Sequence, residues 1–160
     1  MNTGEPGGSG AAHPDSREAD SPAHHQPLLD GAELDHAAIA VRSFDEMVPL
    51  LEQLSGARAT RPERVERQGV EVCFVGNVEL IRPLSEVGSV ARFIDRRGPG
   101  LHHIAYRVPD AGHAMETLAA RGYSFTSEGP MAGAGGHRIA FMHPRSTGGV
   151  LVELVERSEK

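Results

Sequence analysis

The stretch LDHAAIAV at Leu34–Val41 returns in the second half of the chain as LHHIAYRV at Leu101–Val108. A second stretch, VELIRP at Val78–Pro83, returns as VELVER at Val152–Arg157. Each half of the chain therefore opens with a histidine near the start of a predicted strand and closes with a glutamate in the middle of another. Because the two pairs recur at similar intervals, they indicate two copies of one supersecondary unit.

The repeated histidines, His36 and His103, and the repeated glutamates, Glu79 and Glu153, are the candidate functional residues. When two such units pair face to face, matching positions meet across a pseudo-two-fold axis, so all four side chains converge. A carboxylate flanked by apolar residues is costly to bury unless it is paired or bound to a cation. Two imidazoles and two carboxylates at one point predict a metal site. The neighbouring His102 has the opposite strand parity and is expected to face away from this site.

The donor set limits the choice of metal. The absence of thiolate ligands argues against a structural zinc site, whereas mixed imidazole and carboxylate ligation suits Co²⁺, Mn²⁺, Ni²⁺, Zn²⁺ or Fe²⁺. Four protein ligands on an octahedral ion would leave two positions for a substrate.

Composition is consistent with one domain and excludes several function classes. The 160 residues are 39% hydrophobic and carry a net charge of −6. The segment 1–33 holds six acids against one base, so the remainder is nearly neutral and gives no reason to expect a nucleic-acid or membrane partner. The single cysteine, Cys73, rules out an internal disulfide. No apolar run approaches the roughly 18 residues of a membrane span, and no secretory or transit signal is recognisable, which predicts a cytoplasmic protein.

Hydrophobic patterning predicts an α+β domain of tandem βαβββ units. Residues 1–32 have almost no large apolar side chains and are predicted to be a disordered tail, followed by a domain at 33–160 with units at about 34–84 and 101–156. Ser43 and Glu46 form a capping box for a helix that ends at Gly56. The other expected elements are strands at 34–41, 58–67, 70–75, 78–81, 102–108, 123–127, 138–142 and 150–155, a hairpin turn at 76–77, and helices at 89–97 and 111–121.

These units, with their paired His and Glu, resemble the vicinal oxygen chelate superfamily, which includes glyoxalase I, extradiol dioxygenases and bleomycin-resistance proteins. Within it, the strings QGVEV (68–72), GLHHIAYRV (100–108) and GHRIAFMHPRSTGGVLVELVE (136–156) are similar to the methylmalonyl-CoA epimerase family. The likeness runs from about Leu34 to Glu156. It implies a pair of glyoxalase-like half-barrels and divalent-metal ligands at His36, Glu79, His103 and Glu153.

The resemblance also implies an activity and a partner. The expected reaction interconverts the (R) and (S) forms of methylmalonyl-CoA through an enediolate stabilised by the metal, with an acyl-CoA as the small-molecule substrate. A homodimer is compatible with it.

The acid/base groups are less well defined by sequence. Some family members carry a glutamate base where this chain has Val72, and the nearest acid is Glu71. Because strand side chains alternate faces, Glu71 reaches the site only through a local bulge. Glu71 and Glu153 are the predicted acid/base residues.

Substrate contacts are predicted near the loop GPMAGAGG at 129–136. Arg138 and Arg145 would bind the carboxylate or a phosphate of the substrate; a plain hairpin connection is the alternative reading of this loop. Two other functions stay open: a different vicinal oxygen chelate epimerase or lyase acting on another carbonyl compound, and a metal-free small-molecule binding protein.

Overall fold

A computed structural model describes residues 27–158, and they form two βαβββ units joined by one helix. This confirms the predicted α+β class and the tandem arrangement. The first unit consists of β1 (Glu33–Ala40), α1 (Val48–Ser55), β2 (Glu63–Val65), β3 (Val70–Val75) and β4 (Val78–Pro83). The connecting helix is α2 (Ser89–Arg97). The second unit consists of β5 (Gly100–Arg107), α3 (Ala111–Ala119), β6 (Met131–Ala132), β7 (Arg138–Met142) and β8 (Val152–Glu156).

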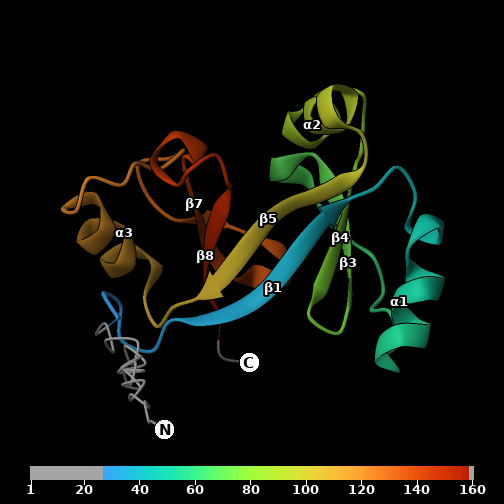
Figure 1. Cartoon of the computed structure of the whole chain (residues 1–160), viewed down its shortest axis with the longest axis horizontal. Coiled ribbons are helices and arrows are strands. Elements are labelled where there is room, and N and C mark those ends of the chain that lie inside the picture. Colours follow the sequence, from blue (N-terminus) through green and yellow to red (C-terminus); the bar gives the residue numbers. More distant parts are fainter. Residues whose placement is uncertain (1–26, 159–160) are drawn as a thin grey trace, which may run out of the picture.

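The two units join edge to edge in one curled eight-stranded sheet rather than facing each other as separate layers. The strand order is β2-β3-β4-β1-β5-β8-β7-β6. Strands β1 and β5 are antiparallel at the centre, and each pairs on its other side, in parallel, with the last strand of its own unit. Figure 1 shows β1 and β5 side by side, with α1 and α3 on opposite flanks. This order places the strands that carry the repeated His and Glu next to one another.

The helix at the start of the first unit is interrupted. The predicted capping box is present, because Ser43 accepts from Asp45 N–H and Glu46 accepts from Ser43 N–H. It caps a 3₁₀ turn, Phe44–Glu46, and α1 begins only at Val48. Pro49 lacks the N–H that would continue the hydrogen-bond ladder through this point. The helix ends as expected at Gly56, whose φ of 71° is left-handed.

Two predicted strands are shorter than expected. Of residues 58–67, only Glu63–Val65 pair as β2, because Pro62 cannot donate to a ladder and a 3₁₀ turn follows at Glu66–Gln68. Residues 123–127 form only an isolated bridge, Phe125 to Met142. The predicted glycine-rich loop at 129–136 contains the short strand β6, which pairs with the near end of β7.

The hydrophobic core is divided between the two units. One cluster lies under α2 and includes Ala38, Val72 and Ile81, and another lies under α3 and includes Met115 and Leu154. Leu29 and Ala32 pack against the second cluster, so the domain includes a few residues that composition assigned to the tail. Residues 1–26 of the predicted tail lie outside the described residues.

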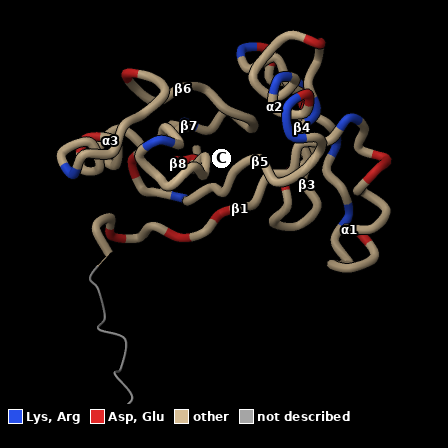
Figure 2. The backbone as a smooth tube through the Cα atoms, turned by 45° about the horizontal axis from the view of Figure 1, so that its top comes forward, with Lys and Arg blue, Asp and Glu red and all other residues tan. Residues whose placement is uncertain are grey.

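Charged side chains are unevenly spread over the described residues. Figure 2 shows acidic residues along much of the backbone and basic residues grouped most densely near α2, where Arg92, Arg96 and Arg97 flank Asp95. Among the described helices, none has both the length and the apolar character needed to cross a membrane.

Candidate metal centre

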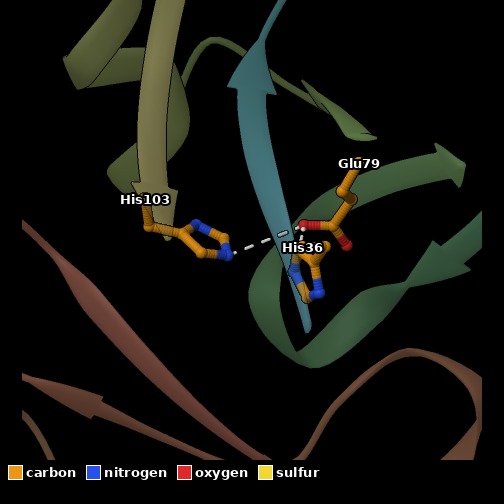
Figure 3. A group of neighbouring side chains, drawn as sticks. All are labelled: His36, Glu79 and His103. Carbon is orange, nitrogen blue, oxygen red and sulfur yellow. Dashed lines mark ion pairs between the residues drawn. The ribbon is translucent and has the colours of Figure 1, made fainter. Parts of the chain in front are cut away.

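The four predicted ligands lie on the four central strands. His36 comes from β1, Glu79 from β4, His103 from β5 and Glu153 from β8, and their exposed fractions are only 6%, 7%, 2% and 5%. The ligand atoms of His36, Glu79 and His103 all lie within 4.8 Å of one another. Figure 3 shows these three side chains pointing toward one another from three strands. The structure therefore brings together residues from both units.

Glu153 completes the cluster. Its Oε2 lies 3.2 Å from His103 Nε2 and 3.4 Å from His36 Nε2. Glu79 Oε2 lies 3.7 Å and 3.5 Å from the same two nitrogens. Although His36 Nε2 is near both carboxylates, it is fully buried and makes no well-formed hydrogen bond with any described residue. A buried nitrogen without a hydrogen-bond partner, aimed at two carboxylates, fits a metal ligand.

The charges of the cluster also fit a divalent cation. Burial alone would lower the pKa of His36, but the carboxylates of Glu153, Glu79 and Asp35 raise it to about 10. Burial would likewise raise the pKa of Glu153, but His103 and His36 hold it below its usual value. Two buried carboxylates thus require nearby positive charge, and a divalent ion supplies it. With two nitrogen and two oxygen donors, the cluster suits a borderline ion such as Co²⁺, Mn²⁺, Ni²⁺ or Zn²⁺.

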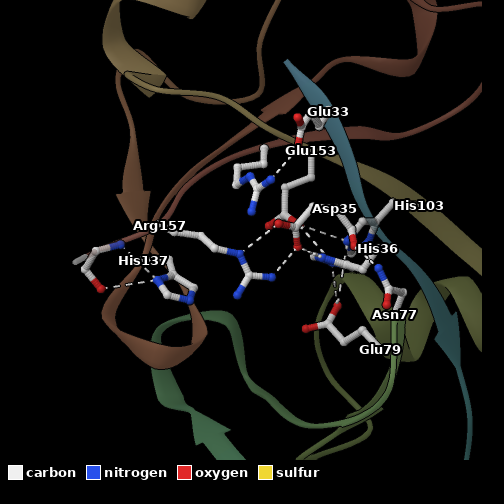
Figure 4. Close-up of polar contacts among 11 residues, drawn as sticks. Glu33, Asp35, His36, Asn77, Glu79, His103, His137, Glu153 and Arg157 are labelled. Carbon is white, nitrogen blue, oxygen red and sulfur yellow. Dashed lines mark hydrogen bonds and ion pairs between the residues drawn. The ribbon is translucent and has the colours of Figure 1, made fainter. Parts of the chain in front are cut away.

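The outer nitrogen of His36 is held by a buried ion pair. Asp35 Oδ1 lies 2.8 Å from His36 Nδ1, and Arg157 donates to both Asp35 oxygens, from Nε at 2.8 Å and from Nη2 at 2.7 Å (Figure 4). Burial would raise the pKa of Asp35, but these hydrogen bonds lower it to about 2. An ionised Asp35 holds a proton on His36 Nδ1, so a metal that binds this imidazole would do so at Nε2, in place of the second proton of the metal-free state.

His103 has a different outer partner. His102 Nδ1 lies 3.0 Å from His103 Nδ1, and Phe93 packs edge-on against the His102 ring at 4.9 Å between centroids. Burial, followed by the neighbouring His103, lowers the pKa of His102 to about 4, so His102 is neutral near pH 7 and its Nδ1 can accept a hydrogen bond from His103 Nδ1–H. The expectation that His102 faces away from the site is therefore wrong.

The reason is a pair of β-bulges. The β1–β5 register shifts between Leu34 and His36, and again between Ala38 and Ile39, where the partner on β5 changes from His103 to Leu101. Asp35 and His102 are the extra residues at these shifts, and a bulge re-aims its side chain. Each directly precedes the repeated histidine of its unit, so the two occupy equivalent positions. The sequence carries no signal for either bulge.

Two phenylalanines at the site were not predicted from the sequence, although they repeat in the two units as the histidines do. Phe74 on β3 packs edge-on against His36, and Phe141 on β7 packs edge-on against His103, with ring centroids 5.3 and 5.4 Å apart. The interval between these phenylalanines is the same as the interval between the histidines. Each unit thus contributes a His, a Glu and a Phe that fixes the imidazole.

Three of the four clustered residues, His36, Glu79 and Glu153, lie in the wall of a cavity of about 370 Å³. One part of the lining is apolar, from Val72, Phe74, Ile139 and Val155. The other part is polar and consists of Asp35, His36, Thr60, Arg61, Glu63, Glu79, His137, Glu153 and Arg157, with Gly76, Ala134 and Gly135 beside them. The cavity thus combines metal-type ligands with an apolar wall and cationic side chains.

Part of the predicted glycine-rich loop borders this cavity. Gly135 N–H donates to both carboxylate oxygens of Glu63, at 2.9 and 3.0 Å, which ties the loop of the second unit to β2 of the first. Gly135 adopts a left-handed φ of 63°, which this turn requires. The loop therefore forms an edge of the cavity.

The remaining predicted site residues lie elsewhere. Glu71 accepts from Arg82 Nε at 2.6 Å, and the β3–β4 register runs without a bulge, so its neighbour Val72 faces the cavity instead. Arg138 donates to Glu156, and Arg145 is exposed on a 3₁₀ turn. None of Glu71, Arg138 and Arg145 is among the described residues that line the cavity.

Comparisons with known proteins agree with this geometry. Residues 35–141 match the family described as the Glyoxalase/Bleomycin resistance protein/Dioxygenase superfamily. The chain is 35% identical over 129 residues to a mitochondrial methylmalonyl-CoA epimerase of Dictyostelium discoideum, and the match covers 78% of each chain.

Two solved structures extend the comparison. A methylmalonyl-CoA epimerase from Mycobacterium tuberculosis is 32% identical and superposes with a TM-score of 0.76 over 85% of this chain and 95% of that one. A methylmalonyl-CoA epimerase in complex with methylmalonyl-CoA and NH4+ is 28% identical, with a TM-score of 0.74 over 79% of this chain and 95% of that one.

Proposed function

The chain belongs to the Glyoxalase/Bleomycin resistance protein/Dioxygenase superfamily, and we propose that it is a metal-dependent epimerase that interconverts the (R) and (S) forms of methylmalonyl-CoA. The observation that carries this proposal is the buried cluster of His36, Glu79, His103 and Glu153, three of which line a cavity. Similarity to methylmalonyl-CoA epimerases over most of the chain supports the choice of substrate.

In this proposal the four clustered residues hold one divalent ion. The ion, when bound, supplies Lewis-acid stabilisation of the negative charge that develops on substrate oxygens as C2 loses its proton. Asp35 and His102 fix the two imidazoles, whose Nε2 atoms lie near the Glu79 and Glu153 carboxylates that would share the ion.

The chain's own side chains would seat the acyl part of the substrate. Val72, Phe74 and Ile139 form an apolar wall beside the clustered carboxylates, and burial against it excludes water from C2. A cavity of about 370 Å³ is large enough for a short branched acyl group but not for a whole coenzyme A. The coenzyme would therefore extend outward through the mouth of the cavity.

Epimerisation needs one group to remove the C2 proton and another to return it on the opposite face. Glu153 is a suitable group, because it lines the cavity in which the acyl part of the substrate would lie. The imidazoles of His103 and His36 hold its pKa below the usual value, so Glu153 is ionised, as a proton acceptor must be. The predicted role of Glu71 as the second group stays a prediction, since its carboxylate is bound to Arg82.

The test uses protein loaded in turn with Co²⁺, Mn²⁺, Ni²⁺ and Zn²⁺ and offered single stereoisomers of methylmalonyl-CoA, ethylmalonyl-CoA and 2-hydroxyacyl compounds. We expect the methylmalonyl thioester to be converted fastest, and only with metal present. His103→Ala is expected to abolish both metal binding and turnover, whereas the matched variant His113→Ala, at an exposed position on α3, retains both.

The other outcomes distinguish the rival functions. Fast turnover of a different carbonyl substrate would assign the chain to another reaction of the same superfamily. Tight binding of a small molecule with no metal requirement would indicate a binding protein.

A further inference from the structure

Arg157 is the feature of the cavity that the proposed chemistry does not use. It follows β8 directly, lines the cavity, and has a side chain that is 48% exposed, although its partner Asp35 is only 3% exposed. In Figure 4 the Arg157 side chain extends toward Asp35, and His137 lies on its other side. Because Asp35 binds one edge of the Arg157 guanidinium and the side chain is otherwise exposed, the guanidinium is available to a ligand.

The way in which Asp35 binds Arg157 leaves a set of donors unused. Among the described residues, the hydrogen-bond partner of Arg157 is Asp35, which takes Nε–H and one Nη2–H. A guanidinium has five N–H donors in one plane, so the two on Nη1 and the second on Nη2 remain. One N–H of Nη1 and the remaining N–H of Nη2 lie side by side at the end of the guanidinium, where the two together match a second carboxylate or phosphate. Because Asp35 fixes the plane, little side-chain entropy is lost when that second anion binds.

Arg157 has no equivalent in the first unit. It lies four positions after Glu153, and the position at the same spacing after Glu79 is Pro83. The duplicated fold is therefore complete without this arginine. Because Arg157 lines the cavity and is present in only one of the two units, it indicates a role in the site that is separate from the duplicated fold.

Arg157 is not the only cation in the lining of the cavity. Of the acidic side chains that line the cavity away from the metal cluster, Asp35 is already bound by Arg157 and His36, and Glu63 is already bound by Gly135 N–H. Arg61 adds a second cation to the same lining. An incoming oxyanion thus meets the guanidinium groups of Arg157 and Arg61 in this lining, while the Glu63 carboxylate is oriented toward Gly135 N–H.

We infer that Arg157 binds an oxyanion of the substrate, with Asp35 as the residue that positions it. This inference rests on the proposed function and deepens it, because it assigns the substrate's anionic group to Arg157. That residue is the outer end of the hydrogen-bonded series Arg157, Asp35 and His36. Two groups of an acyl-CoA have the required chemistry: the free carboxylate on C2 and the phosphates of the coenzyme.

The experiment compares Arg157→Gln and Arg157→Lys with the matched variant Arg121→Gln, whose arginine is exposed just after α3. Calorimetry measures binding of propionyl-CoA, which lacks the carboxylate, and of the pantetheine thioester of methylmalonate, which lacks the coenzyme phosphates. All proteins are saturated with metal, and the metal content is determined. Steady-state kinetics with methylmalonyl-CoA then separates KM from kcat.

We expect Arg157→Gln to weaken binding of one of the two probes on the order of 10- to 100-fold, the loss typical of a hydrogen-bonded charge. A loss confined to propionyl-CoA identifies the phosphates, and a loss confined to the pantetheine thioester identifies the carboxylate. Arg157→Lys is expected to recover part of the affinity, because it keeps the charge but not the two-edged geometry.

Unchanged affinity of both probes in Arg157→Gln, at full metal occupancy, would overturn the inference, and so would an equal loss in Arg121→Gln. Because calorimetry needs no turnover, the outcome is separable from the proposed function. Arg157-dependent binding without epimerisation would support the anion site and reject the epimerase.

Discussion

Replacement of Asp35 by asparagine tests how the residues behind the ligands control the metal centre. Asp35→Asn keeps the size and shape of the side chain and removes its charge. The carboxamide is a weak donor to metals, and the four clustered residues all stay in place. The substitution therefore perturbs only the hold on His36 and Arg157.

The expected magnitude follows from the contacts. His36 Nδ1–H would donate to the amide oxygen, so the amide NH2 must face the guanidinium of Arg157, donor against donor. Loss of an outer partner of a metal-binding histidine typically weakens metal affinity about 10- to 100-fold, or about 1.4–2.7 kcal/mol. The unpaired donors cost roughly a further 1–3 kcal/mol in folding stability.

Metal affinity is measured by competition with a chromogenic chelator, and stability by chemical unfolding of the metal-free protein. Asp95→Asn serves as the control, because Asp95 is exposed on α2. Metal affinity in Asp35→Asn within twofold of the parent would refute the claim that the Arg157–Asp35 pair orients His36.

Three further predictions concern the acid response, the acid/base group and the chain start. The pKa of Asp35 is lowered from 3.8 to about 2, so the ionised carboxylate stabilises the metal-free fold above pH 4. In acid-unfolding curves, the parent should therefore be more stable than Asp35→Asn above pH 4, and this difference should vanish as the pH falls toward 2. If Glu71 is an acid/base group, Glu71→Gln should keep the metal and lose about 10²- to 10⁴-fold in epimerisation rate. An unchanged rate would show that Glu71 serves only to pair with Arg82. Deletion of residues 1–26 should preserve the thermal midpoint, whereas deletion of 1–32 should lower it, because it removes Leu29 and Ala32 from the core; equal midpoints would contradict this packing.

Sequence repetition was sufficient to predict the main features of this protein. The matched His36 and His103, with Glu79 and Glu153, indicated both the tandem βαβββ fold and the cluster, because equivalent positions in a duplicated unit are related by a pseudo-two-fold axis. The same interval also relates Phe74 to Phe141, so the aromatic contacts to both imidazoles were accessible to the same reasoning.

The rest of the site depends on features that side-chain patterning does not encode. The positions of Asp35 and His102 follow from register shifts between β1 and β5, and strand alternation predicts the opposite face for such residues. The arginine that lines the cavity beside the cluster was not predicted for a related reason. Arg138 and Arg145 lie near the glycine-rich loop in sequence, whereas Arg157 is held at the cavity by the buried carboxylate of Asp35, which is distant in sequence.

The most direct test of the central claim is proton exchange at C2 of methylmalonyl-CoA in deuterated water, measured by NMR while the metal-free protein is titrated with a divalent ion. The account predicts that exchange is absent without metal, rises in proportion to bound metal and saturates at one ion per chain, and that His103→Ala shows none at any metal concentration. Exchange at the full rate in the metal-free protein, or none in the fully loaded protein, would contradict it.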